Sequence, residues 1–507
     1  MGKMLFIYSD TSETISFSPA IQILSSVLKM ESVEVDLIHL HHTQGVPFDD
    51  EVVLNKVITY FPDVIGFSAV TYQYEYCNYL VGRLKEKGIK CLVILGGIHA
   101  IISPTDLVTS NFDAFCIGEG EIPLANLFRK IAKGKDVSHT PGFWFKINNK
   151  IIKNPPEKYI MDLNSLPFRD YDIIDTHKLL KLRNKWLSIS FSRGCVYTCS
   201  FCINRKLSNA YKNTCSTGSY FRRNSIERII EELVNLIKEY GEDIRVINFD
   251  DDLLMLDSEW IMKFTEAYKQ NIYDTYKIGF AINGRADLVS EAIIEKLSES
   301  GCNLIRVGFE TGDQNLRNGI LNKNVTDGDF YKSFDLFKKY KLYSLAFSMI
   351  GVLGETEMTI NRSIEMLGDL TPDLIRLTVF KPYIGTPIYD YCQKNNLLIS
   401  EFEGIDDENN YLVLNKDISS QKIRQYQMLF PWFINVKLSI KYADLYADMI
   451  SYFTTNYKFD SKVDVDNVRL AVLKKDKELS DRLYAVGVSH YSYYNQNQMY
   501  FSYNNFS

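Results

Sequence analysis

Three cysteines, Cys195, Cys199 and Cys202, lie within eight residues of this chain. Thiolates are the usual ligands of iron-sulfur clusters, and a cubane cluster takes four of them. Three ligands would leave one iron atom open, and an open iron can bind a substrate or cofactor directly. The spacing therefore predicts a catalytic redox centre, because a pure electron carrier needs no open iron.

Two other interpretations of the cysteines are a zinc site and unrelated structural residues. Structural zinc is closed by four ligands, usually as two separated pairs, and no second pair is present near this one. Cys215 lies thirteen residues after Cys202 and could supply a fourth ligand, but the stretch from Lys206 to Thr214 carries no metal-binding pattern. The sequence favours an iron-sulfur cluster over both interpretations.

The run Ser192-Arg193-Gly194-Cys195-Val196-Tyr197-Thr198-Cys199-Ser200-Phe201-Cys202 resembles the signature of the radical S-adenosylmethionine superfamily. In that family the three cysteines hold a 4Fe-4S cluster, and the amino and carboxylate groups of S-adenosylmethionine occupy the fourth iron. The resemblance implies that Phe201 lies beside the adenine. It also implies an external one-electron donor such as flavodoxin or ferredoxin.

The elements expected to position this loop are six strands that alternate with helices. The predicted strands are Leu187 to Ser190, Ile244 to Phe249, Ile278 to Ile282, Leu304 to Phe309, Ser344 to Ile350 and Leu374 to Phe380. Ile226 to Tyr240 is predicted to be an amphipathic helix, with Glu early and Lys late as the helix dipole favours. The pattern predicts an α/β fold in which residues 186–390 form a partial (β/α)6 TIM-type barrel, with its site at the carboxyl ends of the strands.

Several residues at these strand ends could contact a cofactor. Asp250, Asp251 and Asp252 follow the second strand; they repel one another, so we expect a cationic group nearby, although a solvated acidic turn is the simpler interpretation. The resemblance implies that Asp251 or Asp252 binds the amino group of S-adenosylmethionine. It further implies that Glu310, in the run Gly308-Phe309-Glu310-Thr311-Gly312, forms hydrogen bonds with the ribose or with neighbouring polar groups. The loop beginning at Gly351 is expected to face the adenine. For Arg285 the sequence leaves two roles open, a bridge to a carboxylate or a simple pair with Asp287.

The N-terminal region alternates short apolar runs with amphipathic stretches, as in a parallel sheet covered by helices. The predicted strands are Met4 to Tyr8, Glu34 to His39, Val64 to Phe67, Cys91 to Leu95 and Ala114 to Ile117. The predicted helices are Ser18 to Lys29, Tyr74 to Lys87 and Ile122 to Lys133. This order predicts a flavodoxin-like or Rossmann-like doubly wound domain, whose ligands lie at the carboxyl ends of the strands.

Polar residues and glycines follow the third, fourth and fifth of these strands. They are Ser68, Thr71, Gly96, Gly97, His99, Gly118, Glu119, Gly120 and Glu121. A single strand-end glycine pair is more often a plain turn, but glycines also let the backbone approach a bulky ligand. In this order the residues resemble those of the cobalamin-binding domain that precedes many radical S-adenosylmethionine enzymes.

That resemblance covers residues 1–140 and implies that these residues contact cobalamin, with His99 near the pocket but not on the cobalt. The Asp-x-His-x-x-Gly motif that supplies a lower histidine ligand is absent, since the position reads Ser9 to Thr14. Members of the radical family often lack this motif and hold cobalamin with its nucleotide base displaced. We interpret His39, His41 and His42 as a solvated run.

Two further regions complete the predicted organisation. Residues 141–185 are a linker with a hairpin from Gly142 to Ile152, turned at Asn148-Asn149. Residues 391–507 are predicted to be mostly helical, with an aromatic stripe that packs helices together and a Tyr/Asn-rich end, from Tyr491 onward, that is at least partly loosely ordered.

Composition limits the class of protein. The chain has 507 residues, 46% of them hydrophobic, a net charge of −6 and an odd number of cysteines, nine. This balance is unlike the basic footprint of a nucleic-acid binder and unlike a secreted disulfide scaffold. The first residues match neither a signal peptide nor a membrane span. We expect a soluble, cytoplasmic protein.

With cobalamin present, the resemblance implies methylation of an unactivated centre, with two S-adenosylmethionine molecules consumed per methyl group. The substrate would be a small molecule, a natural-product intermediate or a modified peptide. The alternatives are a radical cyclase or rearrangement enzyme, with or without cobalamin, and a non-enzymatic iron-sulfur or cobalamin sensor. The full set of strand-end residues argues against the sensor, which needs no adenosine-binding site.

Overall fold

The computed structural model describes residues 2–12, 15–212, 219–400, 411–438, 441–488 and 490–493. Glu13, Thr14, Cys215 and most of the Tyr/Asn-rich end, residues 494–507, lie outside the described residues. The chain divides into two compact units, one comprising Met1–Val196 and Lys206–Arg245, the other Tyr197–Arg205 and Val246–Ser507. Each unit is described by itself below.

The first unit contains a seven-stranded sheet with strand order β2-β1-β3-β4-β5-β6-β7. Its five parallel strands are β1 (Lys3–Asp10), β2 (Glu34–His41), β3 (Val64–Ser68), β4 (Leu92–Gly96) and β5 (Ala114–Cys116). All five predicted strands are confirmed, and their order is that of a flavodoxin-like domain. The predicted hairpin is also confirmed: β6 (Phe143–Ile147) and β7 (Lys150–Lys153) pair antiparallel, and the positive φ angles of Asn148 and Asn149, 48° and 59°, fit a tight two-residue turn.

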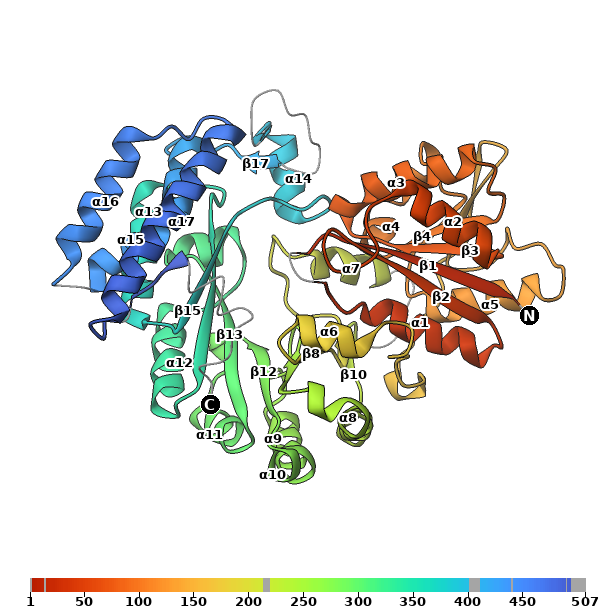
Figure 1. Ribbon diagram of the computed structural model, residues 1–507, viewed down its shortest axis with the longest axis horizontal. Helices are drawn as coiled ribbons and strands as arrows, with labels where there is room; N and C mark the ends of the chain where they lie inside the picture. The colour runs from red at the N-terminus through yellow and green to blue at the C-terminus, as the bar shows by residue number, and fades with distance from the viewer. Residues whose placement is uncertain are drawn as a thin grey trace. The chain divides into compact units, whose positions relative to one another are not determined.

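Helices cover both faces of this sheet (Figure 1). Figure 1 shows α2 (Asp50–Tyr60) and α3 (Thr71–Glu86) on one face, and α1 (Pro19–Met30) and α5 (Glu121–Ile131) on the other. The short helix α4 (Ile98–Ile102) directly follows β4. We did not predict α2, although Asp49 caps it by accepting hydrogen bonds from the Glu51 and Val52 amides. The unit ends with α6 (Thr176–Leu182), β8 (Trp186–Ile189), β9 (Ser192–Arg193), most of α7 (Ile203–Lys212), β10 (Arg222–Arg223) and α8 (Ile226–Tyr240).

The second unit contains the barrel strands, all parallel. They are β11 (Val246–Phe249), β12 (Gly279–Gly284), β13 (Cys302–Glu310), β14 (Tyr343–Ile350) and β15 (Leu374–Val379). Within this unit the strand order is β15-β14-β13-β12-β11, so the chain visits these strands in sequence order. Helices follow the strands, namely α9 (Ser258–Tyr268), α10 (Asp274–Tyr276), α11 (Glu291–Glu299), α12 (Asp327–Lys339), α13 (Glu357–Leu370) and α14 (Pro387–Lys394). The predicted open parallel barrel is confirmed.

The C-terminal region is helical as predicted, after the short hairpin β16 (Leu398–Ser400) and β17 (Tyr411–Val413). Its helices are α15 (Ser420–Leu438), α16 (Ala443–Asn456) and α17 (Lys462–Tyr484). Phe430 and Trp432 are buried, and Trp432 packs with Tyr446 and Phe453 in the core of these helices. The aromatic stripe is therefore helix packing. The start of the Tyr/Asn-rich end is held in place, because the Tyr491 amide donates to Asn435 Oδ1 over 2.9 Å and Ser492 Oγ donates to Asp476 Oδ2 over 2.7 Å.

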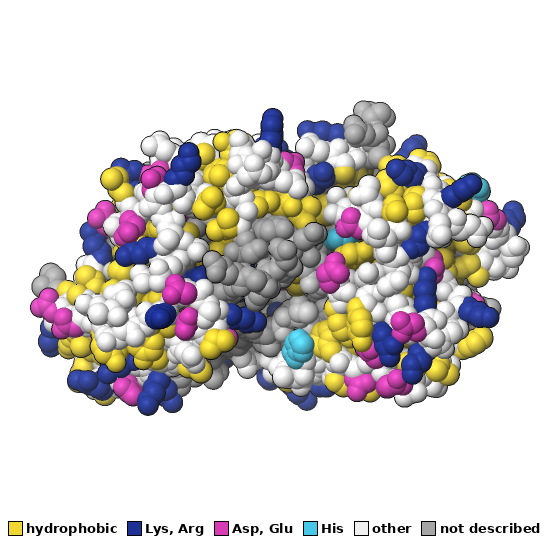
Figure 2. All heavy atoms as spheres, turned by 90° about the horizontal axis from the view of Figure 1, so that it is seen from above, with side chains coloured by type: hydrophobic (Ala, Val, Ile, Leu, Met, Phe, Trp, Pro, Cys, Tyr) yellow, Lys and Arg dark blue, Asp and Glu magenta, His cyan; other side chains and the backbone are white. Residues whose placement is uncertain are grey.

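Charged side chains of both signs are interspersed on the face drawn in Figure 2. Within the described ranges, no helix combines the length and the apolar character needed to cross a bilayer.

Candidate active site

The cysteine loop begins after β9 and runs into α7. Gly194 precedes the first cysteine with a φ angle of +87°, and a Cβ there would lie 2.5 Å from the Tyr220 carbonyl oxygen, so only glycine fits. Cys195 lies in the first unit, whereas Cys199 and Cys202 lie in the second. None of the three forms a disulfide, and burial raises the pKa of Cys202 to about 11.

No three His, Cys, Asp or Glu side chains in the described part of the chain form a ready-made metal site. The assignment of the three cysteines to an iron-sulfur cluster remains a prediction from their spacing. What the donor set offers is three thiols in one short loop, which suits thiolate ligation once the protons are lost.

The second half of the cysteine loop is held by a segment that follows β13. The Ser200 amide donates to the Leu321 carbonyl over 2.9 Å, and Ser200 Oγ donates to the Ile320 carbonyl over 2.6 Å. Asn322 Nδ2 donates to the Thr198 carbonyl over 2.8 Å. Sequence reasoning did not anticipate this segment as a support for the loop.

Phe201 packs in a hydrophobic cluster with residues of two later strand ends. The cluster includes Leu321, Val352 and Phe380, with Phe201 and Leu353 partly buried against it. The structure thus brings Phe201 together with the loop that starts at Gly351. Their predicted place beside adenine remains a prediction.

The three aspartates after β11 have separate surroundings. Asp251 is buried, with 1% of its surface exposed, while Asn204 Nδ2 donates to Asp252 Oδ2 over 2.8 Å. The expected cation is Arg306, whose Nη1 lies 3.7 Å from Asp250 Oδ1. Arg306 also donates to the Phe249 carbonyl over 3.0 Å, which fixes the end of the strand. The sequence did not single out Arg306.

Glu310 ends β13 in a strained conformation and is paired with a lysine. Its φ angle is +66°, unusual for a residue with a side chain, and the strand register shifts between Gly308 and Glu310. Lys323 Nζ lies 2.5 Å from Glu310 Oε1, and both side chains are at most 10% exposed. A Cβ on Gly308 would lie 2.3 Å from Lys323 Nζ, so this glycine makes room for the pair. Sequence reasoning missed Lys323.

Arg285 takes the simpler of the two roles left open. Its Nε lies 3.0 Å from Asp287 Oδ1, and its Nη2 donates to the Lys323 carbonyl over 2.8 Å. The guanidinium also lies 3.5 Å from the ring centre of Tyr197 in the cysteine loop. Arg285 therefore ties together the cysteine loop and the segment that carries Lys323.

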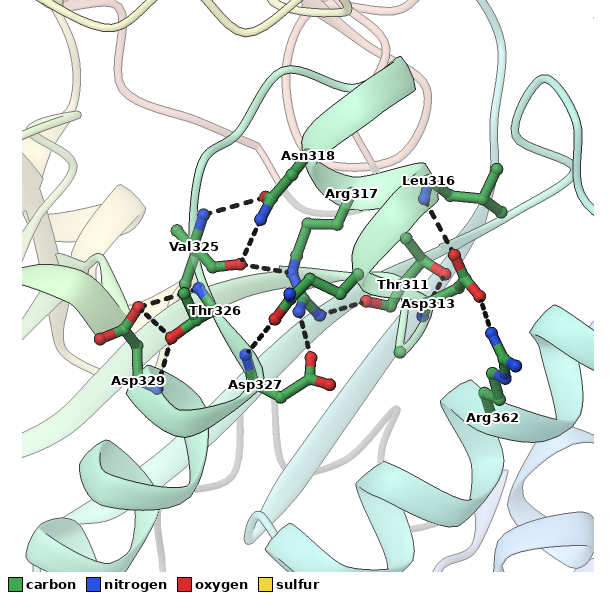
Figure 3. Close-up of polar contacts among 12 residues, drawn as sticks. Thr311, Asp313, Leu316, Arg317, Asn318, Val325, Thr326, Asp327, Asp329 and Arg362 are labelled. Carbon is green, nitrogen blue, oxygen red and sulfur yellow. Dashed lines mark hydrogen bonds and ion pairs between the residues drawn. The ribbon is translucent and has the colours of Figure 1, made fainter.

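Arg317 organises the turn between Glu310 and Lys323 (Figure 3). It is fully buried, at 0% exposure, inside a π-helical turn, Leu316–Ile320. Its Nη1 donates to the Thr311 carbonyl over 2.8 Å, its Nε donates to the Val325 carbonyl over 2.9 Å, and its Nη2 pairs with Asp327. Figure 3 also shows Asp313 accepting from the Leu316 amide and pairing with Arg362.

The loop after β14 is stabilised by a buried carboxyl group. Gly351 has a φ angle of +84°, and its amide and that of Val352 donate to Glu355 Oε2. Burial raises the pKa of Glu355 to about 8. Asn415 fastens the loop from outside, because its Oδ1 accepts from the Gly354 amide over 2.8 Å and its Nδ2 donates to the Val352 carbonyl over 3.0 Å.

The first unit contains a cavity of about 320 Å³ at the carboxyl ends of its strands. Of the residues predicted to contact cobalamin, the cavity is lined by Ser68, Gly96, Gly97, Gly118, Glu119, Gly120 and Glu121. The same cavity is lined by apolar residues of β1, α1 and α5, including Phe6, Ile23, Leu24 and Leu124. The linker also contributes Leu163, Leu166, Pro167 and Arg169.

The glycines that line this cavity differ in whether the fold requires a glycine at their position. A Cβ at Gly96 would have only the Phe67 carbonyl oxygen, at 3.6 Å, within 4 Å, and a Cβ at Gly118 would meet only the ring of Tyr211, with the hydroxyl at 3.8 Å. No tight protein contact requires glycine there, and side chains would project into open space. Gly97 is required by the fold itself, because its φ angle is +89° and a Cβ would lie 2.6 Å from the Ala69 carbonyl oxygen.

His99 and Thr71 do not line the cavity. The His99 ring stacks on Tyr74 with 3.9 Å between ring centres, and burial lowers its pKa to about 4. Its side chain is thus part of the aromatic core of the unit, not of the pocket in which we expected it. Thr71 is the first residue of α3.

The loop after β1, where a cobalt-binding histidine motif is absent, is closed by Asp10. This buried carboxylate accepts from the Ser12 amide over 3.0 Å and the Ser16 amide over 2.6 Å, and lies 3.1 Å from His39 Nε2. His41 is also buried, at 2% exposure. The interpretation as a solvated run was wrong for His39 and His41, which fasten this loop, whereas His42 is exposed as predicted.

Comparisons with known proteins agree with this architecture. Residues 189–367 match the model of the radical SAM superfamily, and residues 7–128 match that of the B12 binding domain. An uncharacterized methyltransferase of Pyrococcus horikoshii is 28% identical over 349 residues, which cover 68% of this chain and 72% of the relative. An anaerobic magnesium-protoporphyrin IX monomethyl ester cyclase of Rubrivivax gelatinosus is 24% identical over 355 residues, 68% of this chain and 60% of that protein.

Two solved structures share the fold over most of the chain. The radical S-adenosylmethionine methyltransferase TsrM from Kitasatospora setae, with cobalamin and a 4Fe-4S cluster bound, has a TM-score of 0.68 at 14% identity and covers 87% of this chain and 90% of its own. The cobalamin-dependent S-adenosylmethionine radical enzyme OxsB, with aqua-cobalamin and S-adenosylmethionine bound, has a TM-score of 0.69 at 14% identity. The match covers 99% of this chain and 84% of the OxsB chain. Residues 7–128 thus match the B12 binding domain, and residues 189–367, which follow them in the chain, match the radical SAM superfamily.

Proposed function

We propose that this protein is a cobalamin-dependent radical S-adenosylmethionine methyltransferase acting on an unactivated centre of a small-molecule or peptide-derived substrate. The observation that carries the proposal is the presence, in one chain, of a three-cysteine loop after a barrel strand and a strand-end cavity in a B12 binding domain. A radical enzyme without a methyl carrier would not need the second feature.

The residues present fit the cofactors that the family implies. Cys195, Cys199 and Cys202 offer three thiols for a 4Fe-4S cluster. The cavity offers glycines whose missing side chains leave open space, and an apolar wall able to take the displaced nucleotide base of cobalamin. When bound, the cluster supplies the electron that cleaves S-adenosylmethionine, and cobalamin supplies a methyl-carrying metal centre.

The chain's own residues would bind and orient S-adenosylmethionine. Asp251 or Asp252 would accept hydrogen bonds from its amino group, and Glu310 from its ribose hydroxyls. Lys323, paired with Glu310 over 2.5 Å, holds that carboxylate in place and puts a positive charge beside it. Phe201 and the Gly351 loop would enclose the adenine and exclude water, as the hydrophobic packing around Phe201 supports.

Anaerobic reconstitution tests the proposal. Wild-type protein supplied with iron, sulfide, cobalamin, S-adenosylmethionine and a one-electron donor such as flavodoxin or ferredoxin should form S-adenosylhomocysteine beside 5'-deoxyadenosine. Cys199→Ala should abolish both products, whereas Cys91→Ala, which removes a thiol of the first unit outside the cavity lining, should retain them. Full activity in Cys199→Ala would refute the proposal.

A second candidate function is radical cyclisation or rearrangement. It is favoured by the likeness to the magnesium-protoporphyrin cyclase of Rubrivivax gelatinosus, which extends over 68% of this chain. The same assay separates the two functions. Formation of 5'-deoxyadenosine without S-adenosylhomocysteine would favour cyclisation, because that reaction transfers no methyl group.

A further inference from the structure

Glu119, Glu121 and Arg193 line the cavity and form three ion pairs that also include Arg222. Arg222 binds Glu119 with both nitrogens of its fork, Nη2 to Oε1 over 2.8 Å and Nη1 to Oε2 over 3.0 Å. Arg193 Nη1 lies 3.1 Å from Glu119 Oε1, and its Nη2 lies 2.6 Å from Glu121 Oε1. Burial alone would raise the pKa of Glu119, but hydrogen bonds from Arg222 and the charge of Arg193 hold it below its usual range. The two carboxylates and the two guanidinium groups of this cluster therefore balance in charge.

Glu121 has one oxygen that these pairs leave unused. The residue is 4% exposed and lines the cavity, and its Oε2 is buried without a hydrogen-bond partner, while its Oε1 binds Arg193. A buried carboxylate oxygen without a donor is costly. Glu121 also begins helix α5, whose dipole favours a negative charge there. The dipole explains the charge but supplies no donor to Oε2, so a donor from a cavity ligand would satisfy it.

The same ion pair reaches the start of the cysteine loop. Arg193 precedes Cys195 by two residues and stands in β9, opposite Arg222 in β10. Gly194, which joins Arg193 to Cys195, lies against the Tyr220 backbone, where no Cβ fits. Because Arg193 is fixed by Glu119 and Glu121, and Gly194 leaves no room for a shift, the backbone that leads into Cys195 is held by the cavity wall.

We propose that Glu121 divides its two oxygens between two tasks. Oε2 accepts an N–H from a carboxamide on the edge of the ligand, while Oε1 holds Arg193 and, through it, the start of the cysteine loop. The inference rests on the proposed function, since it assigns cobalamin, whose corrin ring carries primary carboxamides, to this cavity. Glu121 is then a binding residue for cobalamin, and Arg193 is a positioning residue for Cys195.

Binding of hydroxocobalamin to the full-length protein tests the first task, with absorbance titration as the readout. Glu121→Ala should weaken binding roughly ten- to hundredfold, the effect of losing a hydrogen bond to a charged acceptor. Glu121→Gln should also weaken hydroxocobalamin binding, because its carboxamide can turn an NH2 group toward the cavity, and that group cannot accept the N–H of the ligand. The matched control is Glu31→Ala, which removes a carboxylate bound by both Arg129 Nε and Nη2 away from the cavity; it should bind like wild type.

Electron paramagnetic resonance of the reduced cluster tests the second task. The signal should change in Arg193→Gln, return toward wild type in Arg193→Lys, and stay unchanged in Glu31→Ala. Melting temperatures verify that each variant is folded. If Glu121→Ala does not fold, the binding test is made with Glu121→Gln alone.

The outcomes separate this inference from the proposed function. Wild-type protein that binds no hydroxocobalamin would refute the proposed function and this assignment with it. Binding by wild type that is unchanged in both Glu121 variants would refute the role of Glu121 alone. An unchanged cluster signal in Arg193→Gln would refute the positioning role.

Discussion

Replacing Arg317 with methionine should destabilise the second unit strongly, because the guanidinium is the donor for two buried carbonyl groups. Arg317, Thr311 and Val325 are all fully buried, so water cannot replace the lost donors. An unsatisfied buried acceptor costs about 1–3 kcal/mol, which gives about 2 kcal/mol for the Thr311 carbonyl. The Val325 carbonyl keeps the Asn318 Nδ2 donor at 3.1 Å, so it adds only about 1 kcal/mol, and the total is about 3 kcal/mol. The third partner, Asp327, has a side chain 46% exposed and can be rehydrated, so its pair adds less than about 1 kcal/mol.

Differential scanning calorimetry of the full-length protein measures this effect. For a unit of this size, 1 kcal/mol shifts the melting temperature by about 2–4 °C, so Arg317→Met should melt about 6–12 °C below wild type. Arg317→Lys, whose single nitrogen can reach one of the two carbonyls, should recover about half of the loss. Asp327→Asn is the matched control at the exposed end of the pair and should melt within about 4 °C of wild type.

Two results would refute this reasoning. A melting temperature of Arg317→Met within about 4 °C of wild type would mean that the carbonyls find other donors. A loss in Asp327→Asn as large as in Arg317→Met would mean that the ion pair, not the buried carbonyls, provides the stability.

Three further predictions concern buried ionisable groups. Lys323→Met should destabilise the protein by about 3–5 kcal/mol, because it leaves Glu310 buried without its partner, and the double variant with Glu310→Gln should regain most of that in denaturant unfolding. Burial raises the pKa of Glu355 from 4.5 to about 8, so the folded state keeps this proton to a higher pH than the unfolded state does. The stability of the protein should therefore fall as the pH rises from 4.5 to 8. Glu355→Gln should flatten this pH dependence in thermal melts, and an unchanged slope would contradict the prediction. Burial lowers the pKa of His99 from 6.5 to about 4, so the unfolded state takes up a proton at a higher pH than the folded state does. Up to about 3 kcal/mol of stability should be lost as the pH falls from 6.5 to 4. His99→Phe, which retains an aromatic ring against Tyr74, should remove that loss in the same melts.

The positions of the strand ends were predictable from the sequence because they depend on local patterns. Short apolar runs bounded by polar residues placed all the parallel strands of both sheets to within about two residues, and parallel strands bring their carboxyl ends to one edge. Helix α2 was missed although Asp49 and the acidic residues after it are an N-terminal capping signal. The error was to let the weak apolar pattern of this segment outweigh its cap.

The partners of the site residues were not predictable, because they come from distant positions. Lys323 is thirteen residues beyond Glu310 and reaches it only through the π-helical turn around Arg317. Arg193 and Arg222 meet Glu119 across the fold of the first unit, and no local pattern marks them as partners. A single sequence contains no signal for such pairings beyond the requirement that a buried carboxylate be matched.

His99 was misplaced for a reason of helix geometry. Residues three apart share one face of a helix, whereas adjacent residues do not. Ile98 and Ile101, three residues apart in α4, both line the cavity, so the side chain between them at His99 is turned into the core against Tyr74. The segment after β4 is a helical turn, and this geometry places the His99 side chain outside the pocket.

Each unit places a glutamate at the end of a strand and matches it with a basic residue from outside the sheet. In the first unit Glu121 is matched by Arg193, and in the second Glu310 is matched by Lys323. Removing one partner of a buried pair leaves an uncompensated charge, whereas removing both costs less. The basic residues should therefore be as sensitive to substitution as the glutamates, even where only the glutamate touches a ligand. The strand ends in the sequence therefore predict the carboxylates of each candidate site but not their basic partners. Those partners come from β9 in one unit and from the turn after β13 in the other.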